Sequence, residues 1–313
     1  MLFRSLSLVA PRKPRRDRGM AAQESGDAVL NALGAEHPEW RPLLAVVEQA
    51  LLEAEHLVGA GFMPELERSN SDDQPLLSGA VIHVTPRLVE RWVRRVVTAA
   101  AGARAKPLLE AVAAGRLDAL SVFEAAVSRD VDRLDDLARV GRDDGGVLRG
   151  LAPVIAMPML QACRRAWADR VSAGWAHGHC PICGSWPALA EIRGLDGSRH
   201  LRCGSCGDDW RTEWLRCPFC GERDHENLGS LVSPDSLERQ KIDVCDGCGG
   251  YLKTITTLAP IPPEHVVLQD LATLVLDVAA LEQGYRRPSA RGRVPVSVVA
   301  ERSRLRTLLR RRS

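Results

Sequence analysis

Four short cysteine motifs constrain the fold of this chain more than any other feature. Eight of its nine cysteines form C-x-x-C pairs, and a glycine directly follows each pair. The pairs are Cys180/Cys183, Cys203/Cys206, Cys217/Cys220 and Cys245/Cys248. The two-residue spacer turns both sulfurs toward one point, and the glycine can adopt a positive φ that closes the turn. Two pairs place four thiolates at about 2.3 Å from one metal ion, so four pairs predict two complete tetrahedral sites.

Other roles for these cysteines fit the pattern less well. Disulfides suit a secreted chain, but no secretory signal is visible and the ninth cysteine, Cys163, has no counterpart. A thioredoxin-like redox pair normally occurs singly, and the compact ferredoxin run of cysteines is absent. Four soft sulfurs in a tetrahedron suit zinc and equally a single iron ion, so the residues alone leave the metal open.

An internal repeat predicts how the pairs combine. CPICG at 180–184 and CPFCG at 217–221 are nearly identical, and each is followed by a strand-like segment, a turn, a second strand-like segment and a second pair. This order is typical of zinc ribbons and rubredoxins. We therefore expect Cys180, Cys183, Cys203 and Cys206 to hold one ion, and Cys217, Cys220, Cys245 and Cys248 to hold the other. An interleaved pairing stays open.

The chain before the cysteines has the pattern of a helical domain. Aromatic residues make up only 4% of the chain, and apolar residues recur at helical spacing over 27–172. Cys163 lies among apolar positions there, so we predict a small buried side chain and not a ligand. The expected helices are 36–60, one starting at Thr85-Pro86 with threonine as its cap, 118–129, 131–140 and 147–171.

Composition and charge complete the predicted organisation. The net charge is +2, but residues 1–19 carry +5 and residues 286–313 carry +9, so residues 20–285 carry −12. No apolar run approaches the ~18 residues of a membrane-spanning helix. We predict an α+β protein with tandem rubredoxin-like or zinc-ribbon modules after the helical domain. Its parts are a disordered basic leader (1–26), the helical domain (27–172), a double four-cysteine ribbon domain (173–256), a C-terminal helix that packs back (257–287) and an arginine-rich tail (288–313).

No motif of an active site accompanies the cysteines. The chain lacks H-E-x-x-H, G-x-S-x-G and a phosphate-binding glycine loop. His177, His179, His200 and His225 lie close to the pairs, but every coordination place already has a thiolate, so we expect them beside the sites or in solvent. An ion with four cysteine ligands has no open position for water. The pattern therefore favours binding over enzymatic turnover.

The cysteine region resembles the FdhE-type accessory proteins of formate dehydrogenase. The resemblance covers residues 175–287 and rests on the order and spacing of all four pairs together with the YLK and EQGY words. The matching runs are CPICGSWP (180–187), LRCGSCGDDW (201–210), CPFCG (217–221), CDGCGGYLKT (245–254), DLATLVLD (270–277) and EQGYRR (282–287). Two departures stand out: Trp214 replaces a common family arginine, and 288–313 is unlike the usual tail.

The resemblance implies a non-catalytic cytoplasmic protein that active respiratory formate dehydrogenase requires. Such proteins bind the catalytic subunit before its export by the twin-arginine route. Family members are described as rubredoxin-like and iron-binding through cysteines that match the eight here. That implication favours two iron ions per chain, with zinc as the second choice, in structural or redox-active sites.

Partner binding suggests further hypotheses. Trp186, Trp210 and Trp214 either pack over the sites or contact a partner, and the acidic body of the chain would suit the basic end of a client. Two alternatives stay open: an iron-containing electron-transfer protein, and a zinc-ribbon protein that binds nucleic acid. Nucleic acid is the less favoured partner, because the basic residues lie in the two ends and not in the ribbon region. The sequence carries no indication of oligomeric state.

Overall fold

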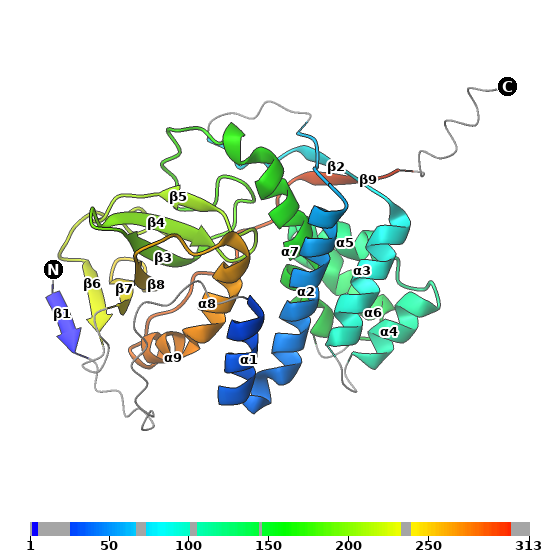
Figure 1. The fold of residues 1–313 in the computed structure, drawn as a ribbon, viewed down its shortest axis with the longest axis horizontal. Coiled ribbons are helices and arrows are strands. Elements are labelled where there is room, and N and C mark those ends of the chain that lie inside the picture. The colour runs from blue at the N-terminus through cyan, green and yellow to red at the C-terminus, as the bar shows by residue number, and fades with distance from the viewer. Residues whose placement is uncertain are drawn as a thin grey trace. The chain divides into compact units, whose positions relative to one another are not determined.

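The structure is a computed structural model of the 313-residue chain, and it describes residues 2–5, 26–66, 73–100, 105–143, 146–232 and 239–301. The chain forms two compact units, which Figure 1 shows as a ribbon. The first, here called the ribbon unit, comprises Met1–Glu36, Gly174–Pro181 and Ser185–Arg291. The second, the helical unit, comprises His37–Ala173, Ile182–Gly184 and Gly292–Ser313.

One sheet forms the centre of the ribbon unit, with strand order β1-β6-β7-β8-β3-β4-β5. Each predicted module contributes an antiparallel three-stranded ribbon, and the two ribbons join through a parallel pair between β3 and β8 that runs from Leu189↔Lys253 to Arg193↔Thr257. The strands are β1 (Leu2–Ser5), β3 (Pro187–Arg193), β4 (Ser198–Cys203), β5 (Asp209–Arg211), β6 (Leu228–Val232), β7 (Gln240–Cys245) and β8 (Gly250–Thr257).

Short helices complete the ribbon unit. They are α1 (Gly26–Glu36), the 3-10 turn η3 (Pro263–His265), α8 (Val266–Ala272) and α9 (Leu274–Glu282), so the predicted C-terminal helix is interrupted at Thr273. The side chain of Val266 from α8 is buried with Leu189 and Ile255 of the sheet. A second apolar cluster joins α9 to β6, β7 and β8 through Leu231, Ile242, Val244, Tyr251, Leu276, Ala279, Ala280 and Tyr285.

The helical unit follows the sequence prediction closely. Its long helix α7 (Val147–Trp167) contains two prolines and packs against α2 and α5. The buried face of α3 includes Trp92, whose ring meets Phe123 of α5 edge-on at 5.1 Å. The helices are α2 (Arg41–Gly59), α3 (Pro86–Ala99), α4 (Lys106–Ala113), α5 (Ala119–Ser128), α6 (Val131–Val140) and α7, with the 3-10 turns η1 (Pro38–Trp40) and η2 (Ala168–Arg170). Thr85 stands at the N-cap of α3, but its side chain makes no capping hydrogen bond.

The ends of the chain differ from the predicted outline. Helix α1 belongs to the ribbon unit because it contacts α8, and within the tail β9 (Val296–Ala300) pairs in parallel with β2 (Ala80–Val84) of the helical unit. Strand β1 lies at the start of the predicted disordered leader and pairs with β6. The rest of that leader up to residue 25, and the tail from residue 302, lie outside the described residues. The α+β class, with helices first and two four-cysteine modules after them, is confirmed.

A buried ion-pair cluster fixes the C-terminal helices on the sheet. Lys253 of β8 is fully buried, and its ammonium donates to Asp277 Oδ2 of α9 at 2.7 Å and contacts Asp270 Oδ1 of α8 at 2.6 Å. Tyr251 donates its hydroxyl hydrogen to Asp277 Oδ1 at 2.7 Å, and Arg287 contacts both carboxylates. Every charge has an opposite partner, so the cluster joins strand and helices without an isolated buried charge.

Among the described residues, none of the helices is long and apolar enough to cross a bilayer.

The titration of Tyr251 tests this cluster. Burial, followed by the hydrogen bond to Asp277, raises the pKa of the Tyr251 phenol to about 12, against an ordinary value of about 10. The stabilisation from the neutral phenol is therefore complete below pH 10 and lost as the pH rises through 12. In a Tyr285→Phe variant, Tyr251 is the only remaining tyrosine, and ultraviolet titration of its phenolate should give the raised value.

A second variant separates the effect of the Asp277 carboxylate on the pKa of Tyr251 from the effect of burial. Adding Asp277→Asn to Tyr285→Phe should move the pKa of Tyr251 back toward 10, because the negative charge that opposes ionisation is gone. A phenol that titrates near 10 already in the single variant would contradict the buried arrangement.

Candidate metal centres

The cysteine pairs adopt the turns that their spacing predicts. The glycine after each pair has a positive φ, between 67° and 82°. Three of these glycines donate their N–H to the carbonyl of the first cysteine of the pair at 2.8–3.0 Å: Gly207 to Cys203, Gly221 to Cys217 and Gly249 to Cys245. The Cys203/Cys206 turn begins at the last residue of β4, and the Cys245/Cys248 turn begins at the last residue of β7. The sheet therefore sets the positions of both second pairs.

The eight sulfurs gather into two groups of four. Within each group all ligand atoms lie within 4.8 Å of one another. Site 1 consists of Cys180, Cys183, Cys203 and Cys206, and site 2 of Cys217, Cys220, Cys245 and Cys248, which is the sequential grouping that the repeat predicts.

The spacing of the sulfurs fits a single ion in each group. In site 1 the sulfurs of Cys180 and Cys206 are 3.5 Å apart. In site 2 the sulfur of Cys217 lies 3.8 Å from that of Cys248, and the sulfur of Cys220 lies 3.7 Å from that of Cys245. A tetrahedron with metal–sulfur bonds of about 2.3 Å has edges of about 3.8 Å. The separations are far above the disulfide bond length of about 2.05 Å, and none of the nine cysteines forms a disulfide. Each group could therefore hold a metal ion.

Backbone amides of site 2 are directed at its sulfurs. Burial raises the pKa of Cys217, against the lowering effect of N–H groups from Cys220 and Phe219. Burial would also raise the pKa of Cys220, but the N–H of Glu222 and the neighbouring thiols hold it below its ordinary value. Burial brings the pKa of Cys248 to about 11. Amide donors stabilise the thiolate, which is the form that binds metal, and they oppose the effect of burial at Cys217 and Cys248.

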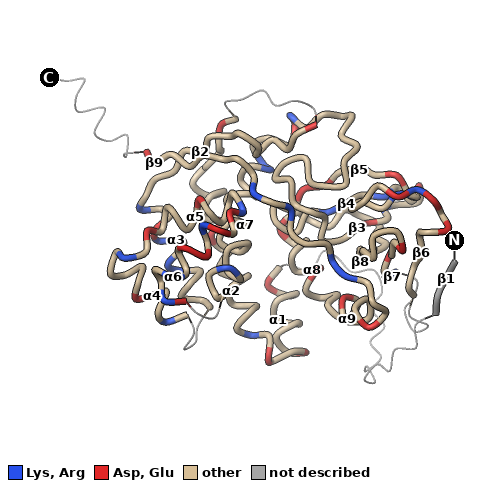
Figure 2. The backbone as a smooth tube through the Cα atoms, turned by 180° about the vertical axis from the view of Figure 1, so that it is seen from behind, with Lys and Arg blue, Asp and Glu red and all other residues tan. Residues whose placement is uncertain are grey.

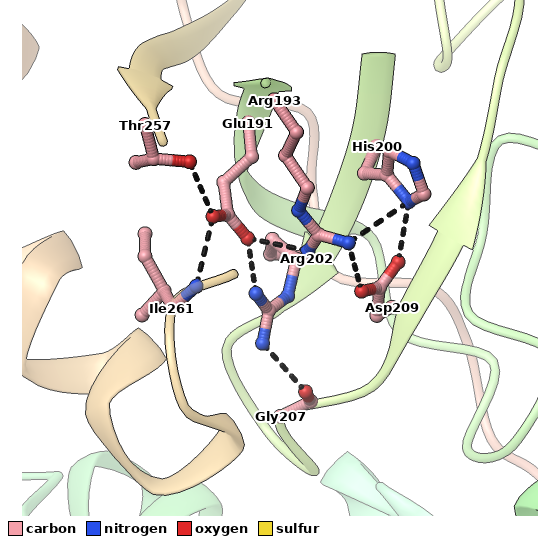
Figure 3. Close-up of polar contacts among 8 residues, drawn as sticks. All are labelled: Glu191, Arg193, His200, Arg202, Gly207, Asp209, Thr257 and Ile261. Atoms are coloured by element: carbon pink, nitrogen blue, oxygen red, sulfur yellow. Dashed lines mark hydrogen bonds and ion pairs between the residues drawn. The ribbon is translucent and has the colours of Figure 1, made fainter. Parts of the chain in front are cut away.

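A buried network of charges supports the Cys203/Cys206 turn of site 1 (Figure 3). Glu191 of β3 and Arg202 of β4 form a buried ion pair, and Arg202 donates onward to the carbonyl of Gly207 at 3.2 Å. The other oxygen of Glu191 accepts from Thr257 at 3.0 Å and from the backbone N–H of Ile261 at 2.9 Å. The carboxylate thus connects β3, β4 and the segment after β8 to the glycine that closes the turn.

The network continues toward β5. Arg193 donates to Glu191 at 2.6 Å and forms an ion pair with Asp209, which also contacts the ring of His200 at 2.7 Å. Figure 2 shows basic and acidic positions close together in the region of β3, β4 and β5. Burial alone would raise the pKa of Glu191, but the hydrogen bond from Arg193 and the charge of Arg202 hold it below its ordinary value. Glu191 therefore stays ionised in the fold.

The turns of site 2 have a different environment. Cys220 and Cys248 are exposed, while Cys217 and Cys245 are buried. The Glu222 carboxylate organises the surface loop after Cys220 by accepting from the N–H groups of Arg223 and Asp224, both at 2.8 Å. These N–H groups, that of Asp224 first, lower the pKa of Glu222. The loop after Cys220 is thus held by surface hydrogen bonds, whereas the Cys245/Cys248 turn is attached to the segment after α9, because Tyr285 donates to Asp246 at 2.6 Å and the N–H of Arg286 donates to the carbonyl of Gly249 at 2.9 Å.

The remaining candidates lie apart from the two groups. None of the four histidines is a member of a sulfur cluster. His225 is exposed, His179 is buried next to Cys180, and His200 belongs to the charge network. Cys163 is fully buried in α7, and burial raises the pKa of its thiol far above the ordinary value. The sequence did not predict the network around Glu191, because charged residues on short strands normally indicate a face exposed to solvent.

Comparisons with known proteins test the resemblance to FdhE that the sequence motifs indicate. No family model matches the chain. FdhE proteins from Escherichia coli O127:H6 and from Escherichia fergusonii are each 28% identical over 302 residues, covering 92% of this chain and 89% of the relative. The predicted resemblance to the FdhE family is confirmed. The likeness to FdhE extends well beyond residues 175–287, so it includes the helical unit as well as the cysteines.

The fold agrees with this result. The crystal structure of the FdhE protein from Pseudomonas aeruginosa aligns with 86% of this chain and 94% of its own, with a TM-score of 0.56 and 22% sequence identity. At that identity the structural likeness concerns the fold, which this chain shares with the crystallised FdhE.

Replacing Glu191 should weaken the fold through the network. Glu191→Gln keeps the shape of the side chain but leaves the charge of buried Arg202 without its partner, which typically costs about 3–5 kcal/mol. Urea unfolding of ion-saturated protein measures the change. The matched control is Asp136→Asn in the exposed pair with Arg139, where little change is expected. Equal stability of Glu191→Gln and the control would contradict the role of the network.

Removing the ions should unfold the ribbon unit. Metal ligation is coupled to folding in small cysteine-rich domains, and without the ions the two turns of each site lose the bonds that join them. Treatment with excess chelator under reducing conditions should abolish the near-ultraviolet circular dichroism of the tryptophans beside the sites. Adding the metal back should restore it. An unchanged spectrum after complete removal would show that the ions do not hold this unit together.

Proposed function

We propose that this protein is an accessory protein for formate dehydrogenase. It binds the catalytic subunit of the respiratory enzyme in the cytoplasm before export, and it is needed for that enzyme's activity. The observation that carries the proposal is the likeness to FdhE over 92% of the chain, together with the two groups of four sulfurs. The eight cysteines hold two metal ions, with iron as the first choice and zinc as the second.

The proposed sites suit a binding protein that performs no turnover. Four sulfurs fill the coordination shell of each ion, so no position is left for a substrate or a reactive water. The ions stabilise the turns and the strands between them. We propose that the rigid sheet presents side chains to the client.

One surface next to site 2 has the properties of a contact site. Of the three tryptophans predicted to contact a partner or pack over the sites, Trp210 is buried, Trp186 is partly buried and Trp214 is 47% exposed. Leu215 is equally exposed. The Trp214 ring nitrogen donates to the carbonyl of Gly197 at 2.9 Å, which fixes the ring while leaving it accessible. A rigid exposed tryptophan is a frequent anchor of protein interfaces.

A small hollow of about 30 Å³ adjoins this tryptophan. Apolar walls and four charged side chains line it, and two site 2 cysteines take part. The lining residues are Arg199, Trp214, Leu215, Arg216, Cys217, Pro218, Phe219, Leu228, Gly229, Lys241, Asp243, Val244, Cys245, Gly250 and Leu252. Arg199 and Asp243 pair at 3.1 Å, so they present no unpaired charge to an apolar group. We propose that the tip of an apolar side chain of the client contacts this hollow beside Trp214.

Replacing Trp214 tests the contact site. Trp214→Ala should weaken binding of the purified catalytic subunit by about tenfold or more, as expected for an interface anchor. Leu258→Ala is the matched control, because Leu258 is 81% exposed and lies outside the lining of the hollow. Calorimetry or surface plasmon resonance measures the affinity. Equal affinities of the two variants would exclude this surface, whereas no binding by the unaltered chain would contradict the proposed function.

A further inference from the structure

The two sites differ in how far their sulfurs are accessible. All four sulfur-bearing residues of site 1 are 0% exposed. In site 2, Cys217 and Cys245 are nearly as buried, but Cys220 and Cys248 lie on the surface. Each exposed cysteine comes from a different pair, so both turns of site 2 meet solvent.

The glycines after the pairs give an independent measure of packing. A methyl group added at Gly207 of site 1 would lie 2.3 Å from the carbonyl oxygen of Pro263. A methyl group at Gly221 or Gly249 of site 2 would meet nothing within 4 Å. The Cys203/Cys206 turn is therefore enclosed by protein, while both turns of site 2 have free space beside them.

The supporting hydrogen bonds follow the same division. The Cys203/Cys206 turn is attached through Arg202 to the buried carboxylate of Glu191 (Figure 3). The loop after Cys220 is organised by Glu222, which is partly exposed to water. Surface hydrogen bonds compete with water, so local opening costs less free energy at the Cys217/Cys220 turn of site 2 than at the Cys203/Cys206 turn of site 1.

We propose that site 1 holds a permanent structural ion and that site 2 holds an exchangeable one, whose ligand-exchange partners are small soft donors such as low-molecular-weight thiols. Metal exchange proceeds when an incoming donor reaches the ion and replaces a protein sulfur. At site 2 an incoming thiolate displaces the thiolate of Cys220 or Cys248, which then takes up a proton from water. The charge of the ion does not change, and no oxidant or reductant takes part.

This inference rests on the proposed metal binding but not on the formate dehydrogenase partner. It gives site 2 a role that site 1 cannot have, because no incoming donor reaches the buried sulfurs without opening of the fold. The metal content of site 2 then depends on the supply of metal and thiols, while the fold around site 1 persists.

Kinetics of metal release test the inference on the full chain. Protein loaded with two ions is mixed with excess EDTA, with and without glutathione, and free metal is followed over time. One ion per chain should leave at least about tenfold faster than the other, since reactivity follows access to the thiolate, and glutathione should accelerate only that phase. A Cys220→Ser, Cys248→Ser double variant should lose the fast phase and keep the slow ion.

Alkylation identifies the site without any variant. Iodoacetamide added at the end of the fast phase, followed by mass spectrometry of peptides, should label the four cysteines of site 2 and spare those of site 1. Release of both ions at one rate, or earlier labelling of site 1, would overturn the inference while leaving metal binding intact. Loading of fewer than two ions per chain would overturn the proposal of two metal sites and the inference together.

Discussion

Eight sulfurs packed into two groups, each within 4.8 Å, are the constraint on which the structure depends. Thiolates at that distance repel one another strongly, and a cation at the centre turns the repulsion into attraction. An ion in each group would thereby join two turns that are about 20 to 30 residues apart in sequence. Two apolar clusters among the described residues of the ribbon unit have four and eight buried members. Ligation would supplement this limited apolar core.

The sheet and its buried charges hold the sulfurs in place. Strands β4 and β7 end at Cys203 and Cys245, so the hydrogen-bonded ladder sets where these ligands start. Lys253 and Glu191 lie in adjacent strands at the parallel junction of the two ribbons, and both are fully buried. Each pairs with side chains from other elements, which makes the packing of those elements specific. Removal of one partner would leave a buried charge uncompensated.

Much of this structure follows from local sequence patterns. The predicted helix over 131–140 coincides with α6, and the spacing of the cysteines predicts both turns and grouping, because helices and turns depend on neighbours in sequence. The pairing of β2 with β9 was not predicted, since two short β-branched runs more than two hundred residues apart carry no local sign of their partner. The sequence also did not predict that Trp214 is exposed and Trp210 buried, because residues distant in sequence determine the packing around each ring. The unequal environments of the two sites come from the same non-local packing.

The central claim is that each group of four sulfurs closes around one ion. X-ray absorption spectroscopy at the metal edge of the purified, ion-loaded protein measures the ligand set directly. The account predicts four sulfur neighbours per ion at about 2.3 Å and no nitrogen or oxygen in the coordination shell. Light-atom ligands in place of sulfur, or a short metal–metal distance typical of a cluster, would contradict it.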